Sequence, residues 1–174
     1  MDTEAPIVYG TADDANHDVK RPCPECPFSR HCQPGIGGAH PFRYVGQAVG
    51  PFLLPCHMAG GFDASGQAKC MPDTAQCGGA ATYRTHIGVS DKMPPAFHRL
   101  PENKTDVFAT PAELVAHHLQ IPVAEAETLL QVYPPEQLCQ EELAIVRAKV
   151  AAKALGVPVP GQAKIMLTPK KDKS

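Results

Sequence analysis

The sequence lacks long apolar runs and an excess of charge of either sign. No stretch approaches the roughly 20 consecutive apolar residues that a membrane-spanning helix requires, so we expect no membrane segment. Lys and Arg number 16 against 18 Asp and Glu, which disfavours general charge-driven nucleic-acid binding. The first ten residues, MDTEAPIVYG, contain no basic stretch followed by an apolar one, so we expect a cytoplasmic protein without a secretory signal.

Aromatic residues and catalytic motifs are also scarce. There is no Trp, and the chain contains only six Phe and four Tyr. No Ser-His-Asp, paired-carboxylate or His-Glu-x-x-His pattern stands out, so no particular reaction is predicted. The glycine-rich stretch PGIGG (34–38) lacks the Lys-Ser/Thr of a phosphate-binding loop and is interpreted as a turn. The composition therefore favours a binding or accessory protein over an enzyme.

Proline, glycine and cysteine are abundant. The chain has 19 Pro and 14 Gly, most of them in the first hundred residues, where six of the seven Cys also lie. A loop-rich segment buries little apolar surface, and it usually needs disulfides or a metal to stay folded. Because a reducing cytoplasm disfavours structural disulfides, the clustered cysteines predict metal or redox chemistry.

The composition divides the chain into four parts. An acidic mobile arm (1–20) precedes a Cys/Gly/Pro-rich metal-binding module (21–100), a helical segment (108–157) and a basic tail (158–174). The predicted fold is a small α+β protein in which the loop-rich, metal-stapled module is followed by three helices. We expect an unidentified protein partner, and the basic tail could in addition contact nucleic acid.

Strands are predicted inside the module and helices after it. Residues 43–56 contain short apolar runs, and residues 80–89 alternate with period two. A helix is predicted over 110–120, where the tetrapeptide TPAE combines an N-cap Thr, a first-turn Pro and a capping-box Glu. Further helices are predicted over 123–132 and 136–155, the last one capped by a glycine.

Cys23 and Cys26 form the pattern C-P-x-C, whose two-residue spacing lets both sulfurs reach one metal ion. A closed tetrahedral site needs two further ligands, and no second C-x-x-C is present. Cys56 precedes a histidine, and Cys77 precedes two glycines that let the backbone approach a metal closely. The predicted metal ligands are therefore Cys23, Cys26, Cys56 and Cys77. Cys32 and Cys70 are reserve ligands, and His57 is a candidate for contact with a ligand.

Cys139 is predicted to have no part in this site. It begins a stripe of apolar residues on the last predicted helix, at spacings of 4, 3, 4 and 4. The members of the stripe are Cys139, Leu143, Val146, Val150 and Ala154. A cysteine in such a stripe is typically a small buried hydrophobic residue.

The order C-P-x-C-P-F-x-R, then C-H, then C-G-G over residues 21–88 resembles an uncharacterised family of small Cys-rich bacterial and bacteriophage proteins. That family typically has the pattern C-x2-C-P-[WFY]-R … C-H … C-x-G. Ser29 interrupts the aromatic-Arg pair, and Cys32 and Cys70 are additional. The resemblance implies a domain type and a phage or mobile-element source, but it implies no reaction.

Three alternatives remain open for the chemistry of the four cysteines, two with a metal and one without. Zinc, ranked first, suits four thiolates in a closed tetrahedral site. A [4Fe–4S] cluster also takes four cysteines. A metal-free redox dithiol ranks third, because the residues after Cys26 offer almost no helix to follow the C-x-x-C pair.

Overall fold

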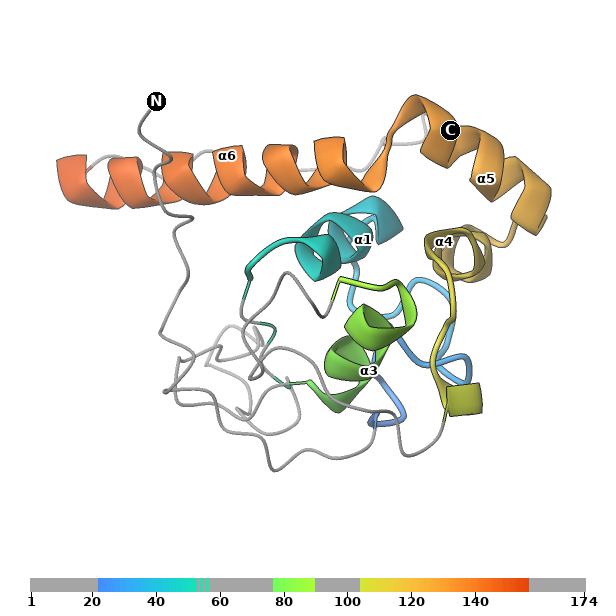
Figure 1. Ribbon diagram of the computed structural model, residues 1–174. Coiled ribbons are helices and arrows are strands. Elements are labelled where there is room, and N and C mark those ends of the chain that lie inside the picture. Colours follow the sequence, from blue (N-terminus) through green and yellow to red (C-terminus); the bar gives the residue numbers. More distant parts are fainter. Residues whose placement is uncertain (1–21, 53, 55, 57–76, 90–103, 157–174) are drawn as a thin grey trace, which may run out of the picture.

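A computed structural model describes residues 22–52, 54, 56, 77–89 and 104–156. The predicted acidic arm and basic tail, together with His57 and Cys70, lie outside the described residues. The elements are α1 (Pro41–Val49), α3 (Gly78–His86), the short 3-10 helix η4 (Lys104–Asp106), α4 (Pro111–Leu119), α5 (Val123–Val132) and α6 (Pro135–Leu155), all labelled or coloured by residue in Figure 1.

The predicted α+β fold is wrong for this part of the chain. Its described residues form five α-helices and no sheet, and the only extended pairing is an isolated bridge between Ser29 and Val107. Neither stretch forms a strand in the described residues, and each contributes to a helix instead. Residues 43–49 lie in α1, and residues 80–86 lie in α3.

Capping and burial explain why these two stretches are helices. His40 caps α1 through Nδ1, which accepts a hydrogen bond from the Phe42 N–H at 3.3 Å, and Pro41 occupies the first helical position. Helix α3 is buried without a break from Gly78 to Arg84. Such complete enclosure in the core outweighs the weak β-preference of its alternating residues.

The three predicted C-terminal helices are confirmed. Thr110 Oγ1 accepts the Glu113 N–H at 3.2 Å, so α4 begins where the capping motif predicts. The Glu113 carboxylate accepts from the N–H of Ala109, one residue earlier than in a standard capping box. Gly156, with φ of 67°, follows the last residue of α6 in the left-handed conformation expected of a helix cap.

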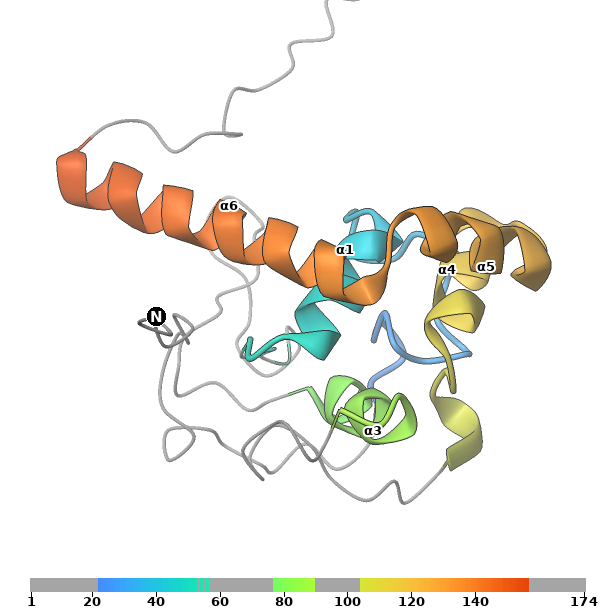
Figure 2. The same cartoon turned by 45° about the horizontal axis from the view of Figure 1, so that its top comes forward.

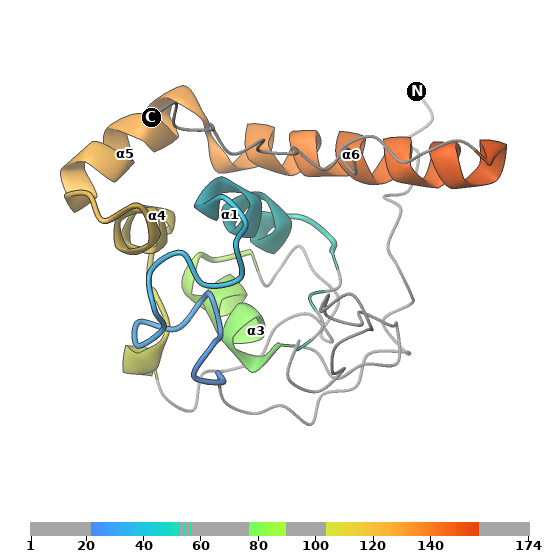
Figure 3. The same cartoon turned by 180° about the vertical axis from the view of Figure 1, so that it is seen from behind.

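Helix α1 lies between α6 on one side and α3 on the other, as Figures 1, 2 and 3 show from three directions. The close approach of α1 and α6 depends on Gly46, because a Cβ there would lie 2.7 Å from the carbonyl group of Leu138. An ion pair between the half-exposed Arg43 and the buried Glu142 also joins the two helices, with Arg43 Nε 2.7 Å from the carboxylate. Gln47 donates to the same carboxylate at 3.0 Å.

The described parts of the Cys-rich module and of the helical segment share one core. Cys26 and Phe28 of the module pack in the same cluster as Leu114 of α4 and Leu138 of α6. A smaller cluster is formed by Phe52, Cys139 and Leu143 with their neighbours. The Cys-rich module therefore packs directly against α4 and α6.

Cys139 and Leu143 are buried, as the apolar stripe on α6 predicts, whereas Val150 further along the stripe is exposed. This C-terminal half of α6 extends beyond α1 in Figures 1 and 2. Among the described residues, no helix combines the length and apolar character needed to cross a membrane.

Candidate metal centre

Cys26 and Cys77 bring their sulfurs to 3.3 Å from each other inside the core. Cys26 lies in a tight turn closed by two backbone hydrogen bonds, from its own N–H to the Cys23 carbonyl and from the Ser29 N–H to the Cys26 carbonyl. Cys77 is the N-cap residue of α3. The turn of the C-P-x-C motif and the start of α3 therefore meet at these two sulfurs, although 51 residues separate them in sequence.

Cys23 and Cys56 form a second pair beside the first. The Cys23 thiol is hydrogen-bonded to that of Cys56, which is 4% exposed. Burial raises the pKa of Cys23 to about 11, with smaller contributions from the nearby charges of Cys56 and Cys77. The chain before Cys56 is held next to α3 because the Cys77 N–H donates to the Leu54 carbonyl at 2.7 Å.

The four sulfurs form two adjacent pairs and not a preformed tetrahedron. Electrostatic interactions connect the pairs, since Cys23 interacts with Cys77 and with Cys26. Within the residues that the structure describes, no three His, Cys, Asp or Glu side chains already have an arrangement that could hold a metal ion. A metal bound at this point would thus have to draw the two pairs together.

The surroundings of Cys77 favour a thiolate. Its pKa is lowered, first by the hydrogen bond from Cys26 and then, against burial, by the N–H groups of Ala80 and Gly79 and by the charge of Arg84. The Ala80 N–H donates to the sulfur at 3.4 Å, and the N-terminus of a helix favours negative charge. The pKa of Cys26 is raised instead, first by the hydrogen bond to Cys77 and then by burial.

Gly79 makes room for the Cys26 sulfur. A Cβ at this position would overlap Cys26 Sγ and would also lie 3.2 Å from Pro22 Cβ. Only glycine lets the first turn of α3 come this close to the cysteine turn. The second glycine of the C-G-G motif is therefore required by the contact between the two segments.

Arg84 is a buried cation close to the sulfurs. It is 1% exposed, and its guanidinium donates to carbonyl oxygens in the last turn of α1 and in the chain just after it, including those of Ala48 at 2.9 Å and Phe52 at 2.6 Å. Burial lowers the pKa of Arg84 to about 10, and the charge of Cys77 opposes this shift. The sequence prediction missed Arg84, although it lies seven residues after Cys77, on the same face of one helix.

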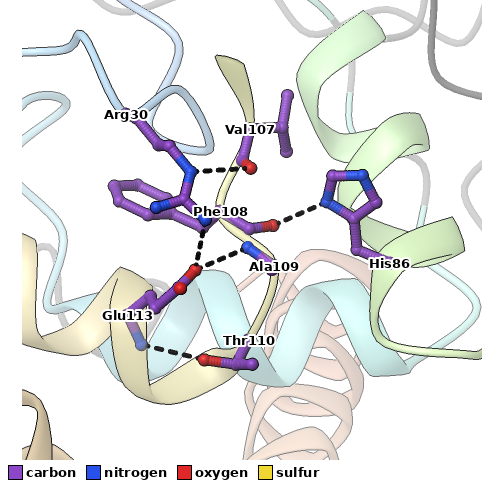
Figure 4. A network of polar contacts seen from close by, with 7 residues as sticks. All are labelled: Arg30, His86, Val107, Phe108, Ala109, Thr110 and Glu113. Carbon is purple, nitrogen blue, oxygen red and sulfur yellow. Dashed lines mark hydrogen bonds and ion pairs between the residues drawn. The ribbon is translucent and has the colours of Figure 1, made fainter. Parts of the chain in front are cut away.

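The arginine of the C-P-F-x-R motif has a supporting role. Arg30 Nε donates to the Val107 carbonyl at 3.1 Å, and its guanidinium pairs with Glu113 at 2.6 Å (Figure 4). The same guanidinium lies over the ring of Phe108, whose carbonyl is 2.9 Å from Nδ1 of His86 in α3. This network ties the cysteine turn to the start of α4, away from the sulfurs.

His118 of α4 holds the loop that follows the motif. Its Nε2 donates to the Pro27 carbonyl at 2.7 Å, while its Nδ1 accepts from the Gly35 N–H at 3.1 Å, which defines one neutral tautomer. The reserve ligand Cys32 lies elsewhere, with its sulfur 3.7 Å from Nε2 of His117. Neither histidine was predicted to have a part in supporting the site.

Comparison with protein-family models, with curated proteins and with solved structures gives no match to this chain.

Proposed function

We propose that Cys23, Cys26, Cys56 and Cys77 bind one zinc ion as thiolates and that the protein is a zinc-stapled accessory protein. The 3.3 Å separation of the Cys26 and Cys77 sulfurs is the observation that carries this proposal. The thiol of Cys23, hydrogen-bonded to that of Cys56, supplies the second half of a four-sulfur site.

The short sulfur–sulfur distance favours zinc over a cluster. Zinc–sulfur bonds of about 2.3 Å in a tetrahedron place the sulfurs about 3.8 Å apart. Cys26 and Cys77, at 3.3 Å, need to separate by only about half an ångström to reach that geometry. The cysteines of a [4Fe–4S] cluster each bind a different iron, so their sulfurs must lie farther apart than ligands of a single ion.

The charge of the surroundings also suits this site. Four thiolates and one Zn²⁺ carry a net charge of −2, which is costly to bury without compensation. The buried guanidinium of Arg84 supplies one positive charge, and the N-terminus of α3 supplies a partial one. Both the Arg84 charge and the N–H groups at the start of α3 interact with Cys77.

The ion would have a structural role. It would link the cysteine turn, the chain around Cys56 and the start of α3, three segments that are far apart in sequence. Metal binding of this kind contributes directly to the folding free energy. A cytoplasmic location would keep the thiols reduced, and the resemblance to bacterial and bacteriophage Cys-rich proteins supports an accessory role, phage-encoded and directed at a protein partner.

Purification of the full chain without oxygen, followed by metal analysis and a visible spectrum, tests the proposal. We expect a colourless protein with one zinc per chain. A brown protein that contains iron and absorbs near about 400 nm would replace zinc by an Fe–S cluster. A colourless protein without metal would exclude both metals and leave a dithiol.

A further inference from the structure

We propose that hydrogen peroxide switches this centre by joining Cys26 to Cys77 in a disulfide, with release of the zinc ion. The release of zinc depends on the proposed function, because it requires zinc to be bound at this site. The choice of Cys26 and Cys77 depends only on the geometry. It assigns a regulatory modification to one particular pair among the four sulfurs.

The geometry selects Cys26 and Cys77. Their sulfurs are 3.3 Å apart and in direct contact, whereas a disulfide bond is about 2.0 Å long. Gly79 allows the Cys26 sulfur to lie against the first turn of α3, where Cys77 caps the helix. An approach of little more than an ångström between two side chains would complete the bond.

The sequence on its own suggests a different pair. A C-x-x-C motif is the usual redox dithiol, which would join Cys23 to Cys26. In the structure the Cys23 thiol is hydrogen-bonded to Cys56, and the Cys26 thiol to Cys77. The two cysteines of the motif therefore belong to different pairs, and their nearest oxidation partners come from other segments.

Cys77 is the better nucleophile of its pair. Its sulfur accepts the Ala80 N–H at the start of α3, and Arg84 lies in the same helix with its guanidinium buried. Cys77 is also the less deeply buried of the two, since it is 7% exposed whereas Cys26 is completely buried. Cys77 is thus suited to react first, with Cys26 as the resolving thiol.

The chemistry balances with hydrogen peroxide as the oxidant. The Cys77 thiolate attacks one peroxide oxygen, the O–O bond breaks, and a sulfenic acid and hydroxide form. The Cys26 thiolate then attacks the Cys77 sulfur, the S–S bond forms, and the S–O bond breaks to release a second hydroxide. Two thiolates lose two electrons in total, and the peroxide gains them. Zinc retains only two of its four ligands and dissociates.

Peptide mapping of the full-length protein tests the inference. The zinc-loaded protein is treated with hydrogen peroxide, its remaining thiols are alkylated, and trypsin is added. Cleavage after Lys20, Arg30, Lys69 and Arg84 gives the peptides 21–30 and 70–84. We expect these peptides to be linked, with fragmentation placing the bond between Cys26 and Cys77. A chromogenic chelator should record the release of one zinc per chain, and dithiothreitol should reverse both changes.

Other products would overturn the inference. A disulfide within peptide 21–30 would show that Cys23 pairs with Cys26. A link to Cys70, or the absence of any disulfide, would also exclude the pairing of Cys26 with Cys77. The Cys139→Ser variant is the control, because its cysteine lies in a different cluster and its loss should leave the product unchanged. The zinc content measured before oxidation tests the proposed function independently. The linked cysteines can be mapped whether or not zinc was bound.

Discussion

The sulfur of Cys26 occupies the space that a Cβ on Gly79 would need. This contact brings the turn of the C-P-x-C motif against the first turn of α3, where Cys77 caps the helix. Two segments that are distant in sequence thereby place two of the proposed zinc ligands in contact.

The Gly79→Ala variant should lose stability, against the trend of helix propensity. Propensity alone predicts that alanine stabilises a helix by about 1 kcal/mol over glycine. Because the new Cβ would overlap Cys26 Sγ, we expect instead a loss of about 1–3 kcal/mol in the free energy of unfolding. Urea denaturation of zinc-loaded protein measures the difference, and an increase in stability would show that the contact is not tight.

Substitution of single cysteines should separate ligands from bystanders. Cys23→Ser should lose the metal and unfold the surroundings of the site. Cys139→Ser should retain one zinc per chain, because Cys139 packs against Phe52 and Leu143 in a separate cluster. Cys32→Ser should retain it too, since that sulfur lies beside His117. Metal analysis of the purified variants reads out each case, and loss of zinc from Cys139→Ser would refute the ligand assignment.

Arg84→Met should be among the most destabilising single changes in the described part of the chain. The guanidinium satisfies several carbonyl oxygens in the last turn of α1 and just after it, including those of Ala48 and Phe52. Leaving them buried without donors should cost about 3 kcal/mol or more. Lysine should restore little, because it lacks the planar fork of donors.

The exposed Arg147 of α6 provides the matched control for Arg84. Arg147→Met removes the same charge and should change the free energy of unfolding by under about 0.5 kcal/mol. Chemical denaturation of both variants gives the comparison. Equal effects would mean that the network around Arg84 contributes little.

His118 should make the protein less stable in mild acid. Burial lowers the pKa of His118, and the nearby His117 lowers it further against the effect of the Pro27 carbonyl. The unfolded chain, with a histidine pKa near 6.5, therefore binds the proton more readily than the folded protein. The stabilising contribution is complete above about pH 6.5 and is lost as the pH falls through the lower folded-state pKa.

Denaturation at several pH values between 5 and 7.5 tests this expectation. The difference between wild type and His118→Gln isolates the contribution of the histidine, because protonation of the cysteines affects both proteins. A parallel pH dependence of wild type and His118→Gln would contradict the expectation.

Local signals predicted the C-terminal half of the fold and missed the rest. The TPAE tetrapeptide and the glycine at 156 mark the ends of α4 and α6 directly, and these helices form as expected. Helix α3 has a cysteine as its cap and alternating Tyr, Thr and Ile residues, so its local pattern indicates a strand. Its cap at Cys77 and its burial from Gly78 to Arg84 favour the helix instead. The signal for α1 was present, because His40 and Pro41 form a recognisable helix start.

The candidate site shows the same division. Cysteine spacing was enough to name four candidate ligands, because few side chains can bind zinc. The pairing of Cys26 with Cys77 and of Cys23 with Cys56 depends on how distant segments pack, and no spacing rule contains that information. Arg84 was missed for the same reason, since its position relative to Cys77 has meaning only once both belong to one helix.

X-ray absorption at the zinc edge of the anaerobically purified full chain reports directly on the ligands of the proposed site. We expect one zinc per chain, coordinated by four sulfur atoms at about 2.3 Å. Cys139→Ser should give the same spectrum. A first shell that contains nitrogen or oxygen from protein side chains, or fewer than four sulfurs, would contradict the assignment of Cys23, Cys26, Cys56 and Cys77 as the complete ligand set.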